Sequence, residues 1–400
     1  MLKLYPNAVN SVVRPPLLVL LLSEEQAGWA QQMSEEGYDV LHVTYPDLTL
    51  ESLNNALRDT TNRIASADYT DWGLITYGLR ETDLRYVAEL FAAPGLKACV
   101  HYCAQLEQAQ SLIVRDHESE KILPTIFHLA SSQELLHASL IPWTDTRALG
   151  YTLPTSSFPP VSVYTYPLVS AKPPFPYMAK APTLVRPGEA QSVDLYVRSA
   201  TGLAYTRTLD LLKRELGPHY NFEKLWEQHT YYEFAERNAL KTMSTMVSTP
   251  YVNHIATLTG GLGFDELARF YKYHFTSDKV TPPDTELIPI SRTIGADRIV
   301  DEMVFKCTHT TEIDYFLPGV APTGKPLEIA LVGIVAFRGD KLTFEYWDQA
   351  SVLVQQLDLL DPTNLPVAGV EVARKMVDPF GLPSNSLMKR WQESEGLPLE

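Results

Sequence analysis

The sequence is poor in cysteine, has no excess of basic charge and contains no long apolar run. Its three cysteines, Cys99, Cys103 and Cys307, are too few and too scattered for a disulfide framework, so we expect a reducing, cytoplasmic compartment. Lys and Arg number 33 against 48 Asp and Glu, a net charge of −15, which argues against nucleic acid or an anionic membrane as a partner. The apolar run at 17–22 is too short to span a bilayer, and it predicts a buried strand.

What is present describes an ordinary globular chain of more than one domain. Its 400 residues are 45% hydrophobic and 20% charged, which suits two or three domains. Many of the 29 prolines lie between Pro154 and Pro187, where extended backbone is favoured over helix. We therefore expect a first domain over residues 1–180, a linker with a helix over 181–219, and a second domain over 220–400.

The first part of the chain alternates apolar runs with helical patterns. Strands that are apolar throughout and separated by helices are typical of a parallel sheet covered on both faces. The pattern therefore predicts an α/β domain with a doubly wound, mostly parallel sheet. The strands are expected at 17–22, 38–43, 72–77, 97–102, 123–129 and 161–166, and helices at 24–36, 48–65 and 83–92.

Three of these stretches resemble the dienelactone hydrolase branch of the α/β-hydrolases. They are Glu36-Gly37-Tyr38-Asp39-Val40-Leu41, Trp72-Gly73-Leu74-Ile75-Thr76-Tyr77-Gly78 and Val163-Tyr164-Thr165-Tyr166-Pro167. The resemblance implies a nucleophile on a sharp turn after one strand, an acid after a later strand and a histidine after the last. It implies a lactone or ester hydrolase if those three groups are present.

The three groups are missing from the places where the resemblance puts them. Gly78 stands at the nucleophile position, and Arg80 replaces a small residue of the turn. Ala130-Ser131-Ser132 follows the strand that should precede the acid, and residues 167–180 contain no histidine. We therefore expect a degenerate, structural first domain.

Three other residues of this domain are weaker candidates for a role. Cys103 follows the strand at 97–102, and because buried cysteine is usually unreactive, it is expected to be inert packing. Thr76 and His128 lie at strand ends, where open α/β sheets bind ligands. A residual binding crevice at those strand ends is therefore a further possibility.

The second domain has helical patterns followed by β-rich segments. Asn221 is expected to cap a helix that continues to about residue 246, and a second helix is expected over 264–275. Strands are expected at 298–313, 327–338 and 342–348, with turns at the Pro/Gly segment 317–325 and at Gly339-Asp340. This order predicts an α+β domain with an antiparallel meander.

Four motifs in this domain resemble the SnoaL-like polyketide cyclase family of the nuclear transport factor 2-like superfamily. They are Thr308-His309-Thr310, Pro318-Gly319-Val320-Ala321-Pro322-Thr323-Gly324-Lys325, Gly339-Asp340-Lys341 and Trp347-Asp348. The resemblance implies a curved antiparallel sheet with helices forming a conical pocket, usually in a dimer. It also implies catalysis without cofactor or metal, in which a pocket carboxylate acts as acid and base in an aldol closure.

Asp348 is the first candidate for acid/base work. It follows Phe344 and Tyr346 on one face of a strand, because side chains alternate, and a carboxylate among apolar residues has a raised pKa. The alternative is that Asp348 only caps the helix that follows. The resemblance places two pocket histidines at His254 and His309, which would polarise a carbonyl or hold a water.

The remaining site candidates would line the pocket. Asn253 is a candidate donor to an oxyanion, and Phe344, Tyr346, Trp347 and Tyr271 are candidate substrate contacts. Tyr346 is favoured over Trp347, because only Tyr346 shares a face with Asp348. No short ligand spacing supports a metal site, and no cofactor is expected. The groups Ser291-Arg292-Thr293 and Asp301-Glu302 are expected at the surface or in a dimer contact.

The sequence thus favours a cofactor-independent cyclase, isomerase or hydratase acting on a small carbonyl or polyketide-like compound. A lactone or ester hydrolase in the first domain is one alternative, and a non-enzymatic ligand-binding or dimerisation protein is another. Apolar positions on both faces of the meander predict a homodimer through the second domain.

Overall fold

The structure, a computed structural model of the 400-residue chain, describes most residues. Residues 47–48, 67–68, 117–118, 145–158, 173–176, 178–179, 190–192, 256, 340, 348–377, 379 and 400 are not described, and neither are the side chains of 328, 330 and 343–347. The chain divides into two compact units. Met1–Leu184 and Ser192–His219 form the N-terminal unit, and Val185–Gln191 and Tyr220–Glu400 form the C-terminal unit.

A seven-stranded sheet in the order β1-β3-β2-β4-β5-β6-β7 forms the centre of the N-terminal unit. β2 to β7 run parallel, and β1 joins the edge antiparallel to β3. This confirms a mostly parallel sheet in the first part of the chain. The strands are β1 (Leu2–Tyr5), β2 (Leu17–Leu22), β3 (Asp39–Thr44), β4 (Trp72–Tyr77), β5 (Leu96–Tyr102), β6 (Thr125–Ala130) and β7 (Val161–Tyr166).

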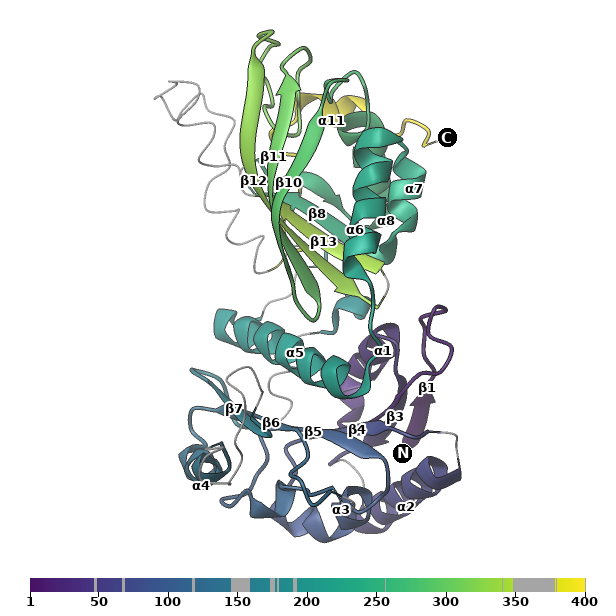
Figure 1. The fold of residues 1–400 in the computed structure, drawn as a ribbon, viewed down its shortest axis with the longest axis vertical. Coiled ribbons are helices and arrows are strands. Elements are labelled where there is room, and N and C mark those ends of the chain that lie inside the picture. Colours follow the sequence, from purple (N-terminus) through teal and green to yellow (C-terminus); the bar gives the residue numbers. More distant parts are fainter. Residues whose placement is uncertain are drawn as a thin grey trace. The chain divides into compact units, whose positions relative to one another are not determined.

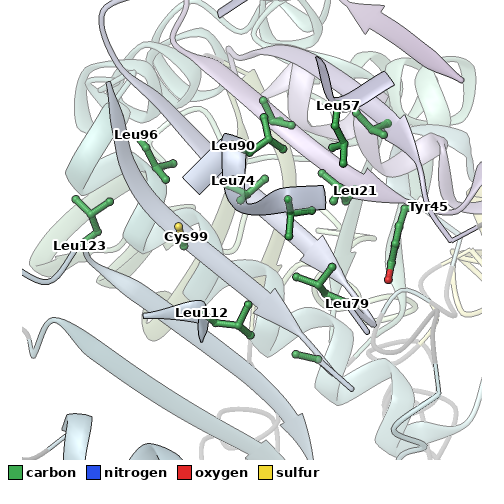
Figure 2. Packing of buried hydrophobic residues seen from close by; sticks show 14 of the residues in the cluster. Leu21, Tyr45, Leu57, Leu74, Leu79, Leu90, Leu96, Cys99, Leu112 and Leu123 are labelled. Atoms are coloured by element: carbon green, nitrogen blue, oxygen red, sulfur yellow. The ribbon is translucent and has the colours of Figure 1, made fainter. Parts of the chain in front are cut away.

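Helices cover both faces of this sheet (Figure 1). Leu17, Val19 and Leu21 of β2 belong to the core under α2 and α3, part of which Figure 2 shows. Leu18 and Leu20 point the other way, into the core under α1 and α5, as the alternation of side chains along a strand requires. The helices are α1 (Gly28–Glu35), α2 (Leu50–Ser66), α3 (Leu84–Phe91), α4 (Glu134–Thr144) and α5 (Leu195–Leu216), with 3₁₀ turns at Glu24–Gln26, Glu81–Asp83, Gln110–Leu112 and Pro182–Leu184.

A six-stranded sheet in the order β10-β11-β12-β13-β8-β9 forms the centre of the C-terminal unit. Neighbours are antiparallel except β13 and β8, which run parallel. Its strands are β8 (Met246–His254), β9 (Thr259–Leu262), β10 (Glu286–Ile294), β11 (Arg298–Thr308), β12 (Pro326–Arg338) and β13 (Lys341–Trp347). The expected meander is thus confirmed over β11 to β13, with β10 added to it.

Helices pack against one face of the second sheet. Ile299, Met303 and Phe305 of β11 lie in the core with Trp226 and Phe270, whereas Glu302 and Lys306 are exposed on the opposite face. The helices are α6 (Phe222–Thr230), α7 (Ala239–Ser244), α8 (Gly263–Phe270) and α11 (Lys389–Glu393), with π-helical turns η5 (Tyr231–Ala235) and η6 (Tyr271–Phe275). None of the helices in the described part of the chain has both the length and the apolar character that crossing a bilayer requires.

Three elements differ from the sequence expectation. Asn221 does cap a helix, by accepting a hydrogen bond from the Lys224 backbone N–H at 2.9 Å. That helix passes into η5, which ends at Ala235, and Arg237 shortly after it has a φ of 51°. The helix expected in a linker is α5, which belongs to the N-terminal unit. Thr259–Leu262, where no strand is expected from the sequence, forms β9, and a Cβ on Gly260 would lie 2.1 Å from the Val252 carbonyl oxygen.

Candidate functional site

One buried stripe of α6 and η5 brings polar groups into the core of the C-terminal unit. Phe222, Trp226, His229 and Glu233 follow one another at helical spacing, and all four are buried. A stripe with this spacing faces the sheet because it occupies one side of a helix. Glu233 lies in the π-helical turn, a rare geometry that is frequent at functional sites. His229 and Glu233 therefore place an imidazole and a carboxylate inside the protein.

The two groups lie at ion-pair distance from each other. Nε2 of His229 is 3.0 Å from Oε1 of Glu233, and both side chains are 0% exposed. Neither carboxylate oxygen of Glu233 has a hydrogen-bond partner among the described residues, so its contact with Nε2 of His229 is an ion-pair distance and not an aligned hydrogen bond. Because an ionised carboxylate without a donor is costly to bury, the protonation of the pair follows from the hydrogen bonds around it.

The hydrogen bond on the other side of the ring fixes one proton. Nδ1 of His229 lies 2.6 Å from Oγ1 of Thr245. The Thr245 hydroxyl donates to the carbonyl oxygen of Thr242 at 2.7 Å, and it has only one hydrogen to give. While Thr245 donates to that carbonyl, it accepts from Nδ1, which then carries a proton.

Nε2 of His229 and Oε1 of Glu233 face each other in the interior, where a bare nitrogen beside an ionised carboxylate would be costly. The Tyr271 hydroxyl lies 3.3 Å from the same Nε2. His229 and Glu233 together are a buried group that can give or take a proton with little movement. We call His229, Glu233 and Tyr271 the acid/base cluster.

A charged pair next to this cluster corrects the expectation for Arg292 and Asp301. Asp301 is 0% exposed and accepts from Nε and Nη2 of Arg292 at 2.6 and 2.7 Å and from Nε1 of Trp226 at 2.8 Å. These hydrogen bonds to Asp301 raise the pKa of Arg292. Because the Trp226 ring stacks on His229, with centroids 5.5 Å apart, the buried ion pair orients one wall of the cluster. Ser291 and Glu302, in contrast, are exposed.

His254 lies in the same core but in a different state. Its Nδ1 donates to Oγ1 of Thr259 at 2.8 Å, because that hydroxyl is itself used on the carbonyl oxygen of Tyr315. Burial lowers the pKa of His254 to about 3, so the ring is neutral. Phe275 connects it to the acid/base cluster, with centroids 5.8 Å from His254 and 5.6 Å from Tyr271.

The structure brings Tyr271 and, through Phe275, His254 to one place, but it places His309 elsewhere. Nδ1 of His309 lies 3.1 Å from Oγ1 of Thr323 in the segment after β11. Burial lowers the pKa of His309 as well. The described contacts of His309 include no member of the acid/base cluster.

The other site candidates lie on β8 and β13 or beyond. Asn253 is 0% exposed, and its side-chain amide has no hydrogen bond to another described residue. In the backbone register, Tyr346 pairs with Asn253, Trp347 with His254, and Phe344 with Tyr251. Asp348 lies outside the described residues, and of Phe344, Tyr346 and Trp347 only the backbone is described, so their roles stay predictions. Among the described side chains, no group of three or more His, Cys, Asp and Glu is placed to hold a metal ion.

In the N-terminal unit, packed side chains occupy the strand ends at which the sequence would place a hydrolase site. Gly78 follows β4 with φ of 53°, and Tyr77 stacks on Tyr102, whose ring stacks on His128, with centroids 4.4 and 4.5 Å apart. Cys103 has φ of 45° but is fully buried, and that burial raises the pKa of its thiol. These positions therefore show packed side chains in place of a reactive nucleophile.

Sequence reasoning missed Glu233, Thr245 and the burial of Asp301. The signal for Glu233 was present, since the stripe of Trp226 and His229 continues to it after four residues. Asp301 occupies the parity of Ile299 and Met303 on β11, so alternation alone would have placed it inside.

No model of a known protein family matches this chain, and no curated protein matches its sequence. Solved structures with SnoaL-like and nuclear transport factor 2-like folds resemble about a third of it. A protein from Jannaschia sp. CCS1, classed as a SnoaL-like polyketide cyclase, is 13% identical over 36% of this chain and 99% of its own, with a TM-score of 0.28. A protein from Catenulispora acidiphila with a ketosteroid isomerase-like fold is 13% identical over 33% and 91%, with a TM-score of 0.26. IdmH from Streptomyces antibioticus, classed as a polyketide cyclase, is 15% identical over 33% and 94%, with a TM-score of 0.26.

Proposed function

We propose that the C-terminal unit is a cofactor-independent acid/base enzyme that acts on a small carbonyl compound. The observation that carries this proposal is the buried His229–Glu233 pair, an imidazole and a carboxylate 3.0 Å apart in the protein interior. Removal of a proton next to a carbonyl and its return elsewhere is the chemistry common to cyclisation, isomerisation and hydration. A group that exchanges one proton between two sites serves both steps.

The other candidates complete this proposal. Asp348, which follows β13 in the sequence, is the expected base. Tyr346 of β13 and Asn253 of β8, two further candidates, pair in backbone register. Neutral His254, which cannot readily gain a proton, would take part as a hydrogen-bonding group and not as a base. Phe344, Trp347 and Tyr271 would contact the substrate.

Proton exchange with solvent tests this function without knowledge of the substrate. Small ketones and 1,3-diketones in D₂O should lose their α-hydrogen to deuterium faster with the protein than without it, as followed by NMR. Glu233→Gln keeps the shape but removes the shared proton site, so exchange should slow by about two to four orders of magnitude. Asp348→Asn should do the same if Asp348 is the base.

Glu236→Gln is the matched control, because Glu236 is exposed and lies three residues from Glu233. It should exchange like the parent protein. If Glu233→Gln is folded and equally fast, or if no member of the panel exchanges, the proposal fails and a ligand-binding or dimerisation protein is the better account.

For the N-terminal unit we infer a degenerate hydrolase-like domain without ester-cleaving activity. Gly78 lies where the nucleophile is expected, and the stacked rings of Tyr77, Tyr102 and His128 fill the neighbouring strand ends. A serine- or cysteine-directed covalent probe should therefore leave residues 70–110 unlabelled.

A further inference from the structure

A second polar array lies at the C-terminal end of the C-terminal unit, outside the acid/base cluster. Nδ1 of His274 is 2.8 Å from Oδ2 of Asp314, and Nε2 of the same ring is 3.1 Å from Oγ of Ser394. All three residues are buried, at 2%, 1% and 4% exposure. A carboxylate on Nδ1 and a hydroxyl on Nε2 is the connectivity of a serine nucleophile with its base and the group that orients the base. We propose that Ser394, His274 and Asp314 form a second catalytic site, a nucleophilic serine that cleaves small esters.

Residues far apart in the sequence hold the array in place. His274 belongs to the π-helical turn η6, Asp314 follows β11, and Ser394 directly follows α11. Arg269 of α8 fastens α11, since its guanidinium lies 3.5 Å from the centre of the Trp391 ring and its Nη2 donates to the Trp391 carbonyl at 2.7 Å. Ser394 is therefore positioned by tertiary contacts on both sides.

The hydrogen bonds around Ser394 allow its hydroxyl to donate to the His274 imidazole. Its oxygen accepts from Nε of Arg269 at 3.0 Å, and its single hydrogen has two acceptors in reach. These are the Trp391 carbonyl at 2.9 Å and Nε2 of His274 at 3.1 Å. When Nδ1 of His274 donates to Asp314, Nε2 can accept. Rotation of the Ser394 hydroxyl then completes the hydrogen-bonded series Ser394–His274–Asp314.

Arg269 gives this serine an advantage over an ordinary helix serine. A guanidinium at hydrogen-bond distance stabilises negative charge that develops on the oxygen during attack. In the first step, Oγ of Ser394 bonds to the ester carbonyl carbon, its proton passes to Nε2, and the departing alcohol takes that proton as its C–O bond breaks. Water then attacks the acyl-serine in the same way, which releases the acid and restores Ser394.

The surroundings indicate the substrate class. Ser394 is buried, but its neighbours Glu393, Glu395 and Gly396 are exposed, so the hydroxyl lies one layer beneath the surface. The two flanking carboxylates disfavour an anionic acyl group by repulsion. The site therefore fits a small ester that is neutral or cationic.

Labelling of the full chain with a neutral alkyl fluorophosphonate, mapped by peptide mass spectrometry, tests this proposal. The parent protein should be labelled at Ser394, and Ser394→Ala should lose that label. Asp314→Asn should label about two to four orders of magnitude more slowly, since it takes away the carboxylate that orients the ring. Ser384→Ala should label like the parent, because the buried Ser384 hydroxyl has no hydrogen-bond partner among the described residues.

Labelling of the parent protein at Ser394 is by itself a test of this proposal. If folded parent protein carries no label at Ser394, the array is only a structural fastening of α11 and the proposal is overturned. Equal labelling rates of the parent and of folded Asp314→Asn overturn it too. Because the probe reports on Ser394 and the deuterium exchange on Glu233, failure of one proposal leaves the other standing.

Discussion

At the scale of single residues, two buried histidines differ in the groups that their ring nitrogens contact. His229 and His254 are both fully buried and both donate from Nδ1 to a threonine. His229 has a carboxylate 3.0 Å from its other nitrogen, whereas the ring contacts of His254 are with Phe270, Phe275 and Tyr315. Nε2 of His229 therefore faces a carboxylate, whereas burial among aromatic rings lowers the pKa of His254.

His254 gives a prediction about acid stability. Its pKa falls from the ordinary 6.5 to about 3 in the folded chain, so the unfolded chain binds one more proton between those values. Stability must then decrease as pH falls from 6.5 toward 3, by up to about 1.4 kcal/mol per pH unit for this proton. His254→Gln should flatten the slope of unfolding free energy against pH in urea titrations between pH 6 and pH 4. An unchanged slope would show that His254 is not buried in the neutral form.

At the scale of elements, sequence patterns predicted the N-terminal sheet better than the C-terminal one. β2, β4 and β7 have the bounds that their apolar or β-branched runs indicate, because strands covered on both faces need such runs. β8 and β9 were not predicted, since Ser248, Thr249 and Pro250 interrupt the first and glycines make up half of the second. They are strands because β8 pairs with β13 and β9 pairs with β8, and the sequence does not display this pairing.

The same limit applies to the helices that build the site. No proline or glycine marks the end of η5 at Ala235, so propensity favoured one continuous helix. The interruption turns the chain so that Thr245, after α7, reaches back to His229. The candidate site was thus predictable in its elements and in Tyr271, but not in the pairing of His229 with Glu233 and Thr245, which depends on tertiary packing.

At the scale of the whole molecule, the outer face of the second sheet gives a prediction about assembly. Ile288, Ile290 and Val332 are 38%, 64% and 40% exposed, and apolar side chains grouped on one sheet are typical of an interface. We expect a homodimer, closed by a two-fold axis, through the C-terminal unit. Light scattering at micromolar concentration should give twice the chain mass of 44.9 kDa, and Val332→Lys should lower it toward the monomer. A monomeric parent protein would contradict this assembly.

The central claim is that His229 carries a proton on Nδ1 and shares a second proton with Glu233. Nitrogen NMR of the ¹⁵N-labelled chain at neutral pH measures this directly, with the His229 signals assigned by their loss in His229→Gln. The account predicts a protonated Nδ1 in the parent protein and in Glu233→Gln, and an Nε2 signal that changes between the two because its proton-sharing partner is gone. An unprotonated Nδ1 with the proton on Nε2 would contradict this claim, and so would an Nε2 signal that is the same in the parent protein and in Glu233→Gln.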